Sequence, residues 1–225
     1  MGAELLRFRL SEQDEPGYAT GVAALARALQ AGQVVAFPTD TVWGVAVLAN
    51  DGEALRRVFE LKGREPEKAL PVFVGSEARA RELLEEFPDP FARLAARFWP
   101  GGLTLVGRPR EGLLDATRAP DGTVALRVPA IRLVQRLLSL LEQPLACTSA
   151  NRSGQPPLAD ALAVMRELGD GLAFVADNDE ATGGLPSTVV ALREDRPRVL
   201  RAGAIPEAEV LNIATGISLD LRQRL

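Results

Sequence analysis

The sequence predicts a single α/β domain with a mixed, mostly covered β-sheet. Strand-like and helix-like segments alternate along the 225 residues, and several of the strand-like runs are apolar throughout. Such runs are typical of strands buried on both faces, since a half-exposed strand alternates apolar and polar residues. A hydrophobic content of 47% is enough for one sizeable core, and no internal repeat or low-complexity linker divides the chain.

The first part of the chain is expected to form a helix, two strands and a second helix. Residues 18–31 carry apolar side chains at helical spacing. The apolar runs 33–38 and 42–49 predict strands. Asp51 is expected to cap a helix that ends at Leu61, because an aspartate before an apolar-periodic segment accepts hydrogen bonds from the first free N–H groups.

The rest of the chain continues this alternation. The run 70–74 predicts a buried strand, and Ser76 and Asp89 are each expected to cap a following helix. Residues 98–102, FWPGG, end the second of these helices and lead into a strand at 103–107. The remaining expected elements are strands at 124–128, 145–148, 172–176, 188–192 and 198–201, and helices at 131–141, 159–168 and 206–213.

Composition excludes several classes of enzyme. There is no histidine, which removes histidine-dependent catalytic triads and histidine metal sites, and the single Cys147 cannot form an intrachain disulfide. Neither lysine precedes Ser or Thr, so no Walker loop is present. The net charge of −4 differs from the strongly basic character of a dedicated nucleic-acid-binding protein. The sequence shows no signal peptide and no membrane-spanning run, so a cytoplasmic location is expected.

Lysine usage is the most unusual feature of the chain. Of 26 basic residues only Lys62 and Lys68 are lysine, and both lie in the segment LKGREPEK. A lysine is a compact point charge suited to a phosphate or carboxylate, whereas an arginine is a planar fork. If Lys62 has such a role, Lys62→Arg should cost activity far more than folding stability. The alternative is that two lysines survived a compositional drift by chance.

Four polar segments lie next to apolar strands, where side chains converge at a sheet edge. They are PTDT at 38–41, KGREPEK at 62–68, TSANRSG at 148–154 and LPST at 185–188. Their cations, hydroxyls and amide suit a polyanionic ligand, although each residue taken alone also fits an ordinary turn. The residues concerned are Thr41, Lys62, Arg64, Lys68, Ser149, Asn151 and Ser187.

Two arginines occupy strand positions that leave their direction open. Arg127 interrupts the apolar strand VALRVPA, and Arg201 ends the run RVLRAG. Each either points to solvent, which is the default for a strand end, or lines a pocket where its fork grips a carboxylate. Gly203, close to Arg201, is a position where the backbone is expected to approach a ligand.

An ordered series of motifs over about residues 20–205 resembles the YrdC-type threonylcarbamoyl-AMP synthases. The motifs are FPTDTVWG from Phe37, LKGR from Leu61, FWPGGLT from Phe98, LRVP from Leu126, TSANRSG from Thr148, PSTVV from Pro186 and LRAG from Leu200. The family's lysine-x-arginine and serine-x-asparagine signature is present as Lys62 with Arg64 and Ser149 with Asn151. Asp40 and Trp43 are conservative departures from the common motif, and WPGG and RAG each lack a proline of the family pattern.

The resemblance implies a twisted α/β domain with a basic concave site that joins L-threonine, bicarbonate and ATP. The implied products are threonylcarbamoyl-AMP and pyrophosphate, and the adenylate serves N6-threonylcarbamoyladenosine formation in tRNA. By motif, the implied threonine-binding residues are Thr41, Arg127 and Ser187, and the ATP-binding residues are Arg64, Lys68, Ser149, Asn151 and Arg201. Lys62 and Arg64 are the expected catalytic residues. Mg²⁺ is expected to come with ATP, and no protein side chain is assigned as a metal ligand.

The resemblance also implies boundaries and partners. Residues 1–205 would form the YrdC-like catalytic domain, and residues 206–225 a C-terminal helix and tail. That leaves no room for the additional C-terminal domain of longer Sua5-type relatives. The expected partners are a downstream tRNA threonylcarbamoyl-transferase complex and weak contact with tRNA or RNA, with no membrane.

Two other readings are open. A non-catalytic YrdC-like RNA-binding protein would keep the basic cleft but would not need a threonine-binding set. A carbamoyl-transfer domain of larger maturation proteins would be embedded beside other domains. The intact motifs around Thr41, Arg127 and Ser187 favour the synthase.

Overall fold

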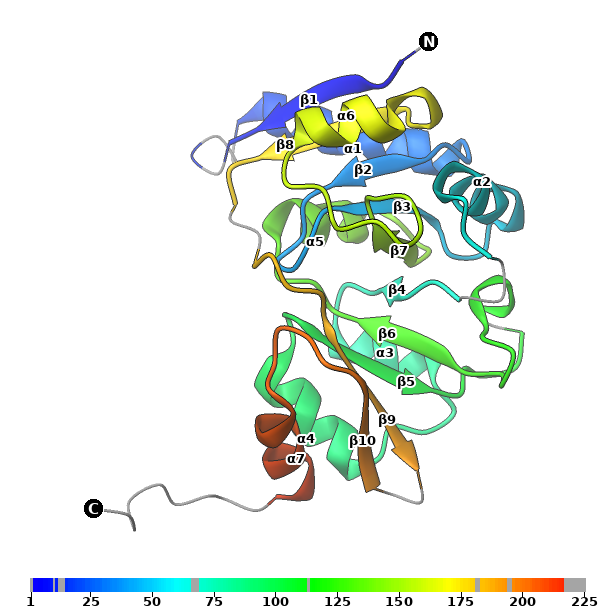
Figure 1. Cartoon of the computed structure of the whole chain (residues 1–225), viewed down its shortest axis with the longest axis vertical. Helices are drawn as coiled ribbons and strands as arrows, with labels where there is room; N and C mark the ends of the chain where they lie inside the picture. The colour runs from blue at the N-terminus through cyan, green and yellow to red at the C-terminus, as the bar shows by residue number, and fades with distance from the viewer. Residues whose placement is uncertain are drawn as a thin grey trace.

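Ten strands of the chain form one mixed sheet, and helices lie on both of its faces (Figure 1). The computed structural model describes residues 2–9, 11, 15–65, 69–112, 114–180, 183–193 and 196–216. The order of strands across the sheet is β1-β8-β2-β3-β7-β4-β6-β5-β9-β10. The α/β class and the single mixed sheet are therefore confirmed.

The strands and helices have the following bounds. The strands are β1 (Glu4–Phe8), β2 (Val35–Phe37), β3 (Gly44–Leu48), β4 (Val72–Phe73), β5 (Leu103–Gly107), β6 (Val124–Arg127), β7 (Leu145–Ser149), β8 (Phe174–Asn178), β9 (Thr188–Arg193) and β10 (Arg196–Arg201). The α-helices are α1 (Pro16–Gln30), α2 (Gly52–Lys62), α3 (Glu77–Leu83), α4 (Asp89–Phe98), α5 (Arg132–Leu140), α6 (Ala161–Leu168) and α7 (Glu207–Thr215). Two short 3-10 helices are η2 (Asp115–Thr117) and η3 (Gly169–Gly171).

The sheet contains both parallel and antiparallel strand pairs. Strand β8 runs parallel to both of its neighbours, β1 and β2, and β4–β6 and β5–β9 are also parallel pairs. The pairs β2–β3, β3–β7, β4–β7, β5–β6 and β9–β10 are antiparallel.

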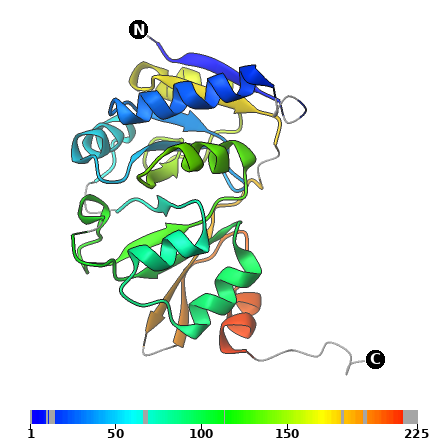
Figure 2. The same cartoon turned by 180° about the vertical axis from the view of Figure 1, so that it is seen from behind.

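The two faces of the sheet are covered differently. Helices α1 and α5 pack on one face of the sheet, against Ala46, Leu48 and Leu145, and Figure 2 shows both helices in front of the strands. On the opposite face, α2 and α6 cover the half that contains β2, β3 and β8 (Figure 1), and α3 and α4 pack over the half that contains β4, β5 and β6. Helix α7 packs beside α4 at the far end of the molecule, and the N-terminus lies at the other end.

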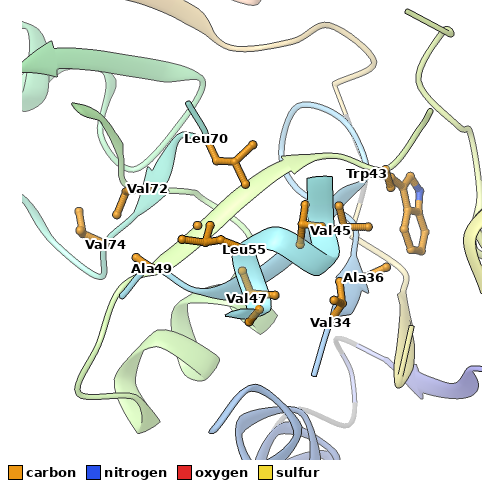
Figure 3. Close-up of a cluster of buried hydrophobic side chains, with 14 of the residues drawn as sticks. Val34, Ala36, Trp43, Val45, Val47, Ala49, Leu55, Leu70, Val72 and Val74 are labelled. Carbon is orange, nitrogen blue, oxygen red and sulfur yellow. The ribbon is translucent and has the colours of Figure 1, made fainter. Parts of the chain in front are cut away.

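The central strands are buried on both faces, as the apolar runs predict. On β3, Val45 and Val47 belong to the cluster on the α2 side, and Figure 3 shows both beside Leu55 of α2. Ala46 and Leu48, the alternate residues of the same strand, belong to the cluster on the α1 and α5 side. This two-sided burial explains why the strand carries no polar alternation.

Two of the three helix caps predicted from the sequence are confirmed. Asp51 accepts a hydrogen bond from the N–H of Ala54 at 2.9 Å, and Ser76 accepts one from Arg79 at 3.2 Å. The predicted cap at Asp89 is wrong, because Asp89 is the first helical residue of α4 and Pro88 is the N-cap. A proline in the first turn fixes a helical φ, so the helix begins at Asp89, whose carboxylate then lies in the first turn.

Two further differences concern the strands beside α1 and α6. Strand β1 was not predicted, since it lies at the edge of the sheet and only Phe8 among its five residues is buried. Strand β8 spans Phe174–Asn178, two residues later than predicted, because the turn η3 occupies Gly169–Gly171 just before it. Within the described residues, no helix has the length and apolar character needed to cross a membrane.

Candidate functional site

The polar segments of the sequence converge on one cavity of about 170 Å³. Residues Thr39, 41–44 and 147–149 line it together with residues of β4, β6 and the β9–β10 region. Of the nine predicted site residues, six line this cavity: Thr41, Arg64, Arg127, Ser149, Ser187 and Arg201. Residues from six separate parts of the chain are thus brought to one place by the sheet.

Arg127 is buried in the wall of the cavity and does not point to solvent. It is 3% exposed, and its Nε donates to the carbonyl of Gly101 at 2.9 Å. Its Nη1 donates to Oγ1 of Thr41 at 2.7 Å, and its Nη2 lies 2.8 Å from Oδ1 of Asp40 in an ion pair. Three separate groups therefore fix the guanidinium, which resolves the direction that the sequence left open.

The loop after β2 is organised around Thr39. The Thr39 hydroxyl donates to the carbonyl of Val42 at 2.7 Å and lies 2.9 Å from the hydroxyl of Thr41. The Thr41 N–H also donates to Thr39 Oγ1, at 3.2 Å. Asp40 accepts a hydrogen bond from the N–H of Ala130 at 3.0 Å, which ties the same loop to the residues after β6. Thr41 is consequently held in place at the cavity wall.

Ser187 lies between Arg201 and Thr104. Nε and Nη2 of Arg201 donate to the carbonyl of Ser187 at 3.1 and 2.8 Å, and Nη2 also donates to Ser187 Oγ at 2.9 Å. On the other side, Thr104 Oγ1 lies 2.8 Å from Ser187 Oγ, and Thr104 is fully buried. Burial lowers the pKa of Arg201, and the nearby positive charges of Arg127 and Arg64 lower it further. The head of Arg201 is therefore part of the cavity wall.

Gly203 makes a close approach, but to the protein itself. A Cβ at this position would overlap the carbonyl carbon of Ser187, at 2.5 Å, and the carbonyl oxygen of Pro186. The close neighbour of Gly203 in the structure is the 186–187 backbone, and the expected approach of a ligand there stays a prediction. A glycine is needed here so that the chain after β10 can pack against the segment that presents Ser187.

Lys62 lies beneath the cavity and not in its wall. It is the last residue of α2 and is 2% exposed, and its Nζ donates to the carbonyls of Ser149 and Asn151. The Lys62 carbonyl in turn accepts from the N–H of Ser153 at 2.8 Å. Burial, and secondarily the charge of Arg64, lowers the pKa of Lys62 to about 8. In this arrangement the ammonium holds the loop after β7 and does not face the cavity.

The two polar side chains of that loop differ in exposure to the cavity. Ser149 ends β7 and lines the cavity, whereas Asn151 is 7% exposed and lies deeper. The Asn151 amide nitrogen donates to the carbonyls of Arg152 and Gln155, at 2.8 and 2.6 Å. Its Oδ1 is buried and has no hydrogen-bond partner within the described part of the chain. One acceptor is therefore available beside the loop.

The lysine segment is described only in part. Arg64 lines the cavity, its Nη2 donates to the carbonyl of Ala69 at 3.2 Å, and burial lowers its pKa. Lys68 lies outside the described residues. Its predicted role therefore stays a prediction.

Sequence reasoning missed the buried threonines behind the site. Thr39 and Thr104 both belong to quoted motifs, but no role was assigned to either. A signal for Thr104 was present in the strand LTLVG, where it lies between Leu103 and Leu105. These two leucines pack on α4, so Thr104 points to the opposite face of the sheet. A fully buried hydroxyl needs a partner, and that partner is Ser187.

Comparison with known proteins places the fold and the site in one family. The model of the family Sua5/YciO/YrdC, which carries the description telomere recombination, matches residues 27–203. The chain belongs to this family. The matched region includes the whole wall of the cavity.

Two relatives show the extent of the similarity. A threonylcarbamoyl-AMP synthase of Pyrococcus abyssi (strain GE5 / Orsay) is 37% identical over 182 residues, which cover 81% of this chain and 54% of that protein. A relative from Mycobacterium tuberculosis (strain CDC 1551 / Oshkosh) is 37% identical over 196 residues, which cover 86% of this chain and 90% of the relative. The chain thus spans about half the length of the first relative and nearly all of the second.

One solved structure is similar over almost the whole chain. It is a crystal structure of P. abyssi Sua5 complexed with L-threonine, with a TM-score of 0.86 and 34% sequence identity. The alignment covers 94% of this chain and 61% of that one. The mixed, open sheet described above is therefore the fold of the Sua5-type proteins.

Proposed function

We propose that this protein is a threonylcarbamoyl-AMP synthase, which makes threonylcarbamoyl-AMP and pyrophosphate from L-threonine, bicarbonate and ATP. The observation that carries the proposal is the convergence of Thr41, Arg127 and Ser187 on one cavity that Arg64 and Arg201 also line. An amino acid needs donors and acceptors at fixed positions, and a triphosphate needs positive charge. The name of the P. abyssi relative and the L-threonine in the crystal structure of P. abyssi Sua5 support the same assignment.

The proposed reaction has two steps that balance without an oxidant or a protein nucleophile. The amine of threonine adds to bicarbonate with loss of water, which gives a carbamate. A carbamate oxygen then attacks the α-phosphorus of ATP, and pyrophosphate leaves. Such phosphoryl chemistry depends mainly on alignment and on neutralising charge, so the absence of histidine is no obstacle.

The roles of the residues follow from their places. Thr41, Arg127 and Ser187 would bind threonine, and Arg64, Ser149 and Arg201 would lie around the nucleotide. Asn151 would support the nucleotide side through its buried amide oxygen, and Lys68 would help to hold ATP. Arg64 is the cavity residue best suited to neutralise charge on the transferring phosphate. Lys62, with its ammonium on two backbone carbonyls, would act by positioning the Ser149–Asn151 loop.

Magnesium would be held mainly by the nucleotide. Within the described residues, no three His, Cys, Asp or Glu side chains cluster in a way that would hold a metal ion. The buried Oδ1 of Asn151 and the hydroxyl of Ser149 are neutral oxygen donors beside the site, and Mg²⁺ accepts such oxygens while keeping phosphate ligands. When bound with ATP, Mg²⁺ would neutralise charge on the phosphates.

The proposal extends to organisation and partners. Residues 1–205 would form the catalytic domain, and residues 206–225 a C-terminal helix and tail, of which α7 packs against α4 and β10. The labile adenylate would pass to a tRNA threonylcarbamoyl-transferase complex, with weak contact to tRNA, in the cytoplasm.

Pyrophosphate release from ATP tests the proposal. Release is expected only when threonine and bicarbonate are both present. Ser187→Ala is expected to raise the KM for threonine. Release that is indifferent to threonine would refute the proposal. No release combined with tight RNA binding would favour the non-catalytic RNA-binding alternative.

A further inference from the structure

Two hydroxyl groups in the cavity wall, those of Thr41 and Ser187, each have further hydrogen-bond partners inside the protein. We propose that two buried threonines, Thr39 and Thr104, orient the hydroxyl hydrogens of Thr41 and Ser187, so that Thr41 can only accept and Ser187 can only donate toward a bound amino acid. Thr39 and Thr104 are then positioning residues, since each acts through the hydroxyl that it touches. The inference rests on the proposed function, because it concerns how that site holds threonine.

The polarity of Thr41 follows from counting hydrogens. The single hydroxyl hydrogen of Thr39 is used in the bond to the carbonyl of Val42, because a carbonyl cannot donate. In the contact of 2.9 Å between the two hydroxyls, Thr41 must therefore be the donor. Thr41 Oγ1 also accepts from Arg127 at 2.7 Å. Its hydrogen and one lone pair are thus used, and what remains for a ligand is one lone pair.

The polarity of Ser187 is the opposite. Thr104 is fully buried, and within the described part of the chain the only hydrogen-bond partner of its hydroxyl is Ser187 Oγ. If Ser187 were the donor, the hydrogen of Thr104 would be buried without an acceptor, which is costly. Thr104 therefore donates, and Arg201 donates to the same oxygen at 2.9 Å. Both lone pairs of Ser187 are occupied, and its own hydrogen is left for the cavity.

This polarity orients the amino acid. An acceptor-only group at Thr41 matches the N–H or O–H donors of threonine, and a donor-only group at Ser187 matches its carboxylate. The positive charge of Arg201 beside Ser187 favours the carboxylate at the same end. The two ends of the substrate are thereby distinguished by groups that need no movement when it binds.

Thr104 offers the cleaner test of the two threonines. Thr39 also holds the turn through Val42 and the N–H of Thr41, so its replacement would disturb the loop itself. Thr104 contacts the site through one hydroxyl, and valine has nearly the same shape without it. Thr117 provides a matched control, because it is a buried threonine whose hydroxyl bonds the carbonyl of Leu114 and which does not line the cavity.

The experiment measures KM for threonine and for ATP in pyrophosphate release, with thermal unfolding in parallel. Thr104→Val is expected to raise KM for threonine about 10-fold, the loss expected when one hydrogen bond is no longer pre-oriented, and to leave KM for ATP unchanged. Thr104→Ser should restore most of the affinity, because it keeps the hydroxyl. Thr117→Val should lower the unfolding temperature and leave both KM values as they are.

A double-mutant cycle shows whether Thr104 acts through Ser187. The variant Thr104→Val with Ser187→Ala is expected to be no worse than Ser187→Ala alone, since the second change removes the group that Thr104 orients. Additive effects would overturn the inference, and so would an unchanged KM in Thr104→Val or a Thr104→Ser variant as impaired as the valine variant. A wild-type protein that releases pyrophosphate without threonine would instead refute the proposed function.

Discussion

Replacing Lys62 with methionine is expected to change how folding stability depends on pH. The side chain is 2% exposed, and burial lowers its pKa from the ordinary 10.5 to about 8. Between these two values the unfolded chain binds more protons at this position than the folded chain does. The free energy of unfolding of the wild type should therefore rise with pH across this window, and the contribution should be absent in Lys62→Met.

The size of the effect follows from the two pKa values. Raising the pH from about 7.5 to about 9.5 should increase the stability difference between wild type and Lys62→Met by about 2 kcal/mol. At the higher pH the neutral amine still donates to both carbonyls. Among the residues that the structure describes, methionine leaves the Asn151 carbonyl without a donor, while the Ser149 carbonyl keeps the N–H of Asn151 at 3.0 Å. An orphaned buried carbonyl costs about 1–3 kcal/mol, so Lys62→Met should be clearly less stable at that pH.

Urea unfolding of both proteins at the two pH values provides the measurement. Groups common to both proteins cancel in the difference, and Arg56→Met, an exposed change on the same helix, should show no pH-dependent difference from wild type. Lys62→Arg should be destabilised at both pH values, since a guanidinium does not lose its proton in this range. This revises the expectation that Lys62→Arg affects activity far more than stability. A stability difference between wild type and Lys62→Met that does not change with pH would refute the reasoning.

Further changes test the packing around the site and the helix caps. Arg127→Met should lower the free energy of unfolding by about 3 kcal/mol, because the carboxylate of Asp40 loses its buried partner; equal stability in a denaturation experiment would contradict this. Asp51→Ala should lower the free energy of unfolding by about 1 kcal/mol in the same experiment, while Asp89→Ala should lower it by less than about 0.5 kcal/mol. Equal losses would show that Asp89 caps α4, as the sequence predicts. Gly203→Ala should destabilise by about 2 kcal/mol or more and lower the melting temperature, since its Cβ would overlap neighbouring backbone; a wild-type melting temperature would show that this segment moves freely.

Much of the fold was predictable because it depends on local pattern. The apolar run at Val45–Leu48 and the cap at Asp51 identify a buried strand and the helix after it, and the structure contains both. Strand β1 was missed because an edge strand such as Glu4–Phe8 has only one buried residue and so little pattern. Asp89 was misplaced because the prolines around it, and not its carboxylate, decide where α4 begins.

The site was predictable as a set of residues but not as a geometry. Thr41, Arg127 and Ser187 could be selected from motifs, yet the direction of Arg127 depends on Asp40 and Gly101, which only the folded chain brings to it. Lys62 contacts carbonyls that lie 87 and 89 residues further along the chain, and no spacing rule predicts such a contact. The orientation of hydroxyl hydrogens likewise depends on partners from distant strands.

Transfer of labelled carbon from bicarbonate into a nucleotide tests the central claim most directly. The protein would be incubated with ¹⁴C-bicarbonate, ATP and L-threonine, and the nucleotides would be separated at once, because the adenylate is labile. Label is expected in an AMP-containing product when threonine is present, and none when threonine is omitted or when Arg127 is replaced by methionine in a variant that is still folded. Absence of labelled nucleotide in the complete mixture, or equal labelling without threonine, would contradict the assignment of this protein as a threonylcarbamoyl-AMP synthase.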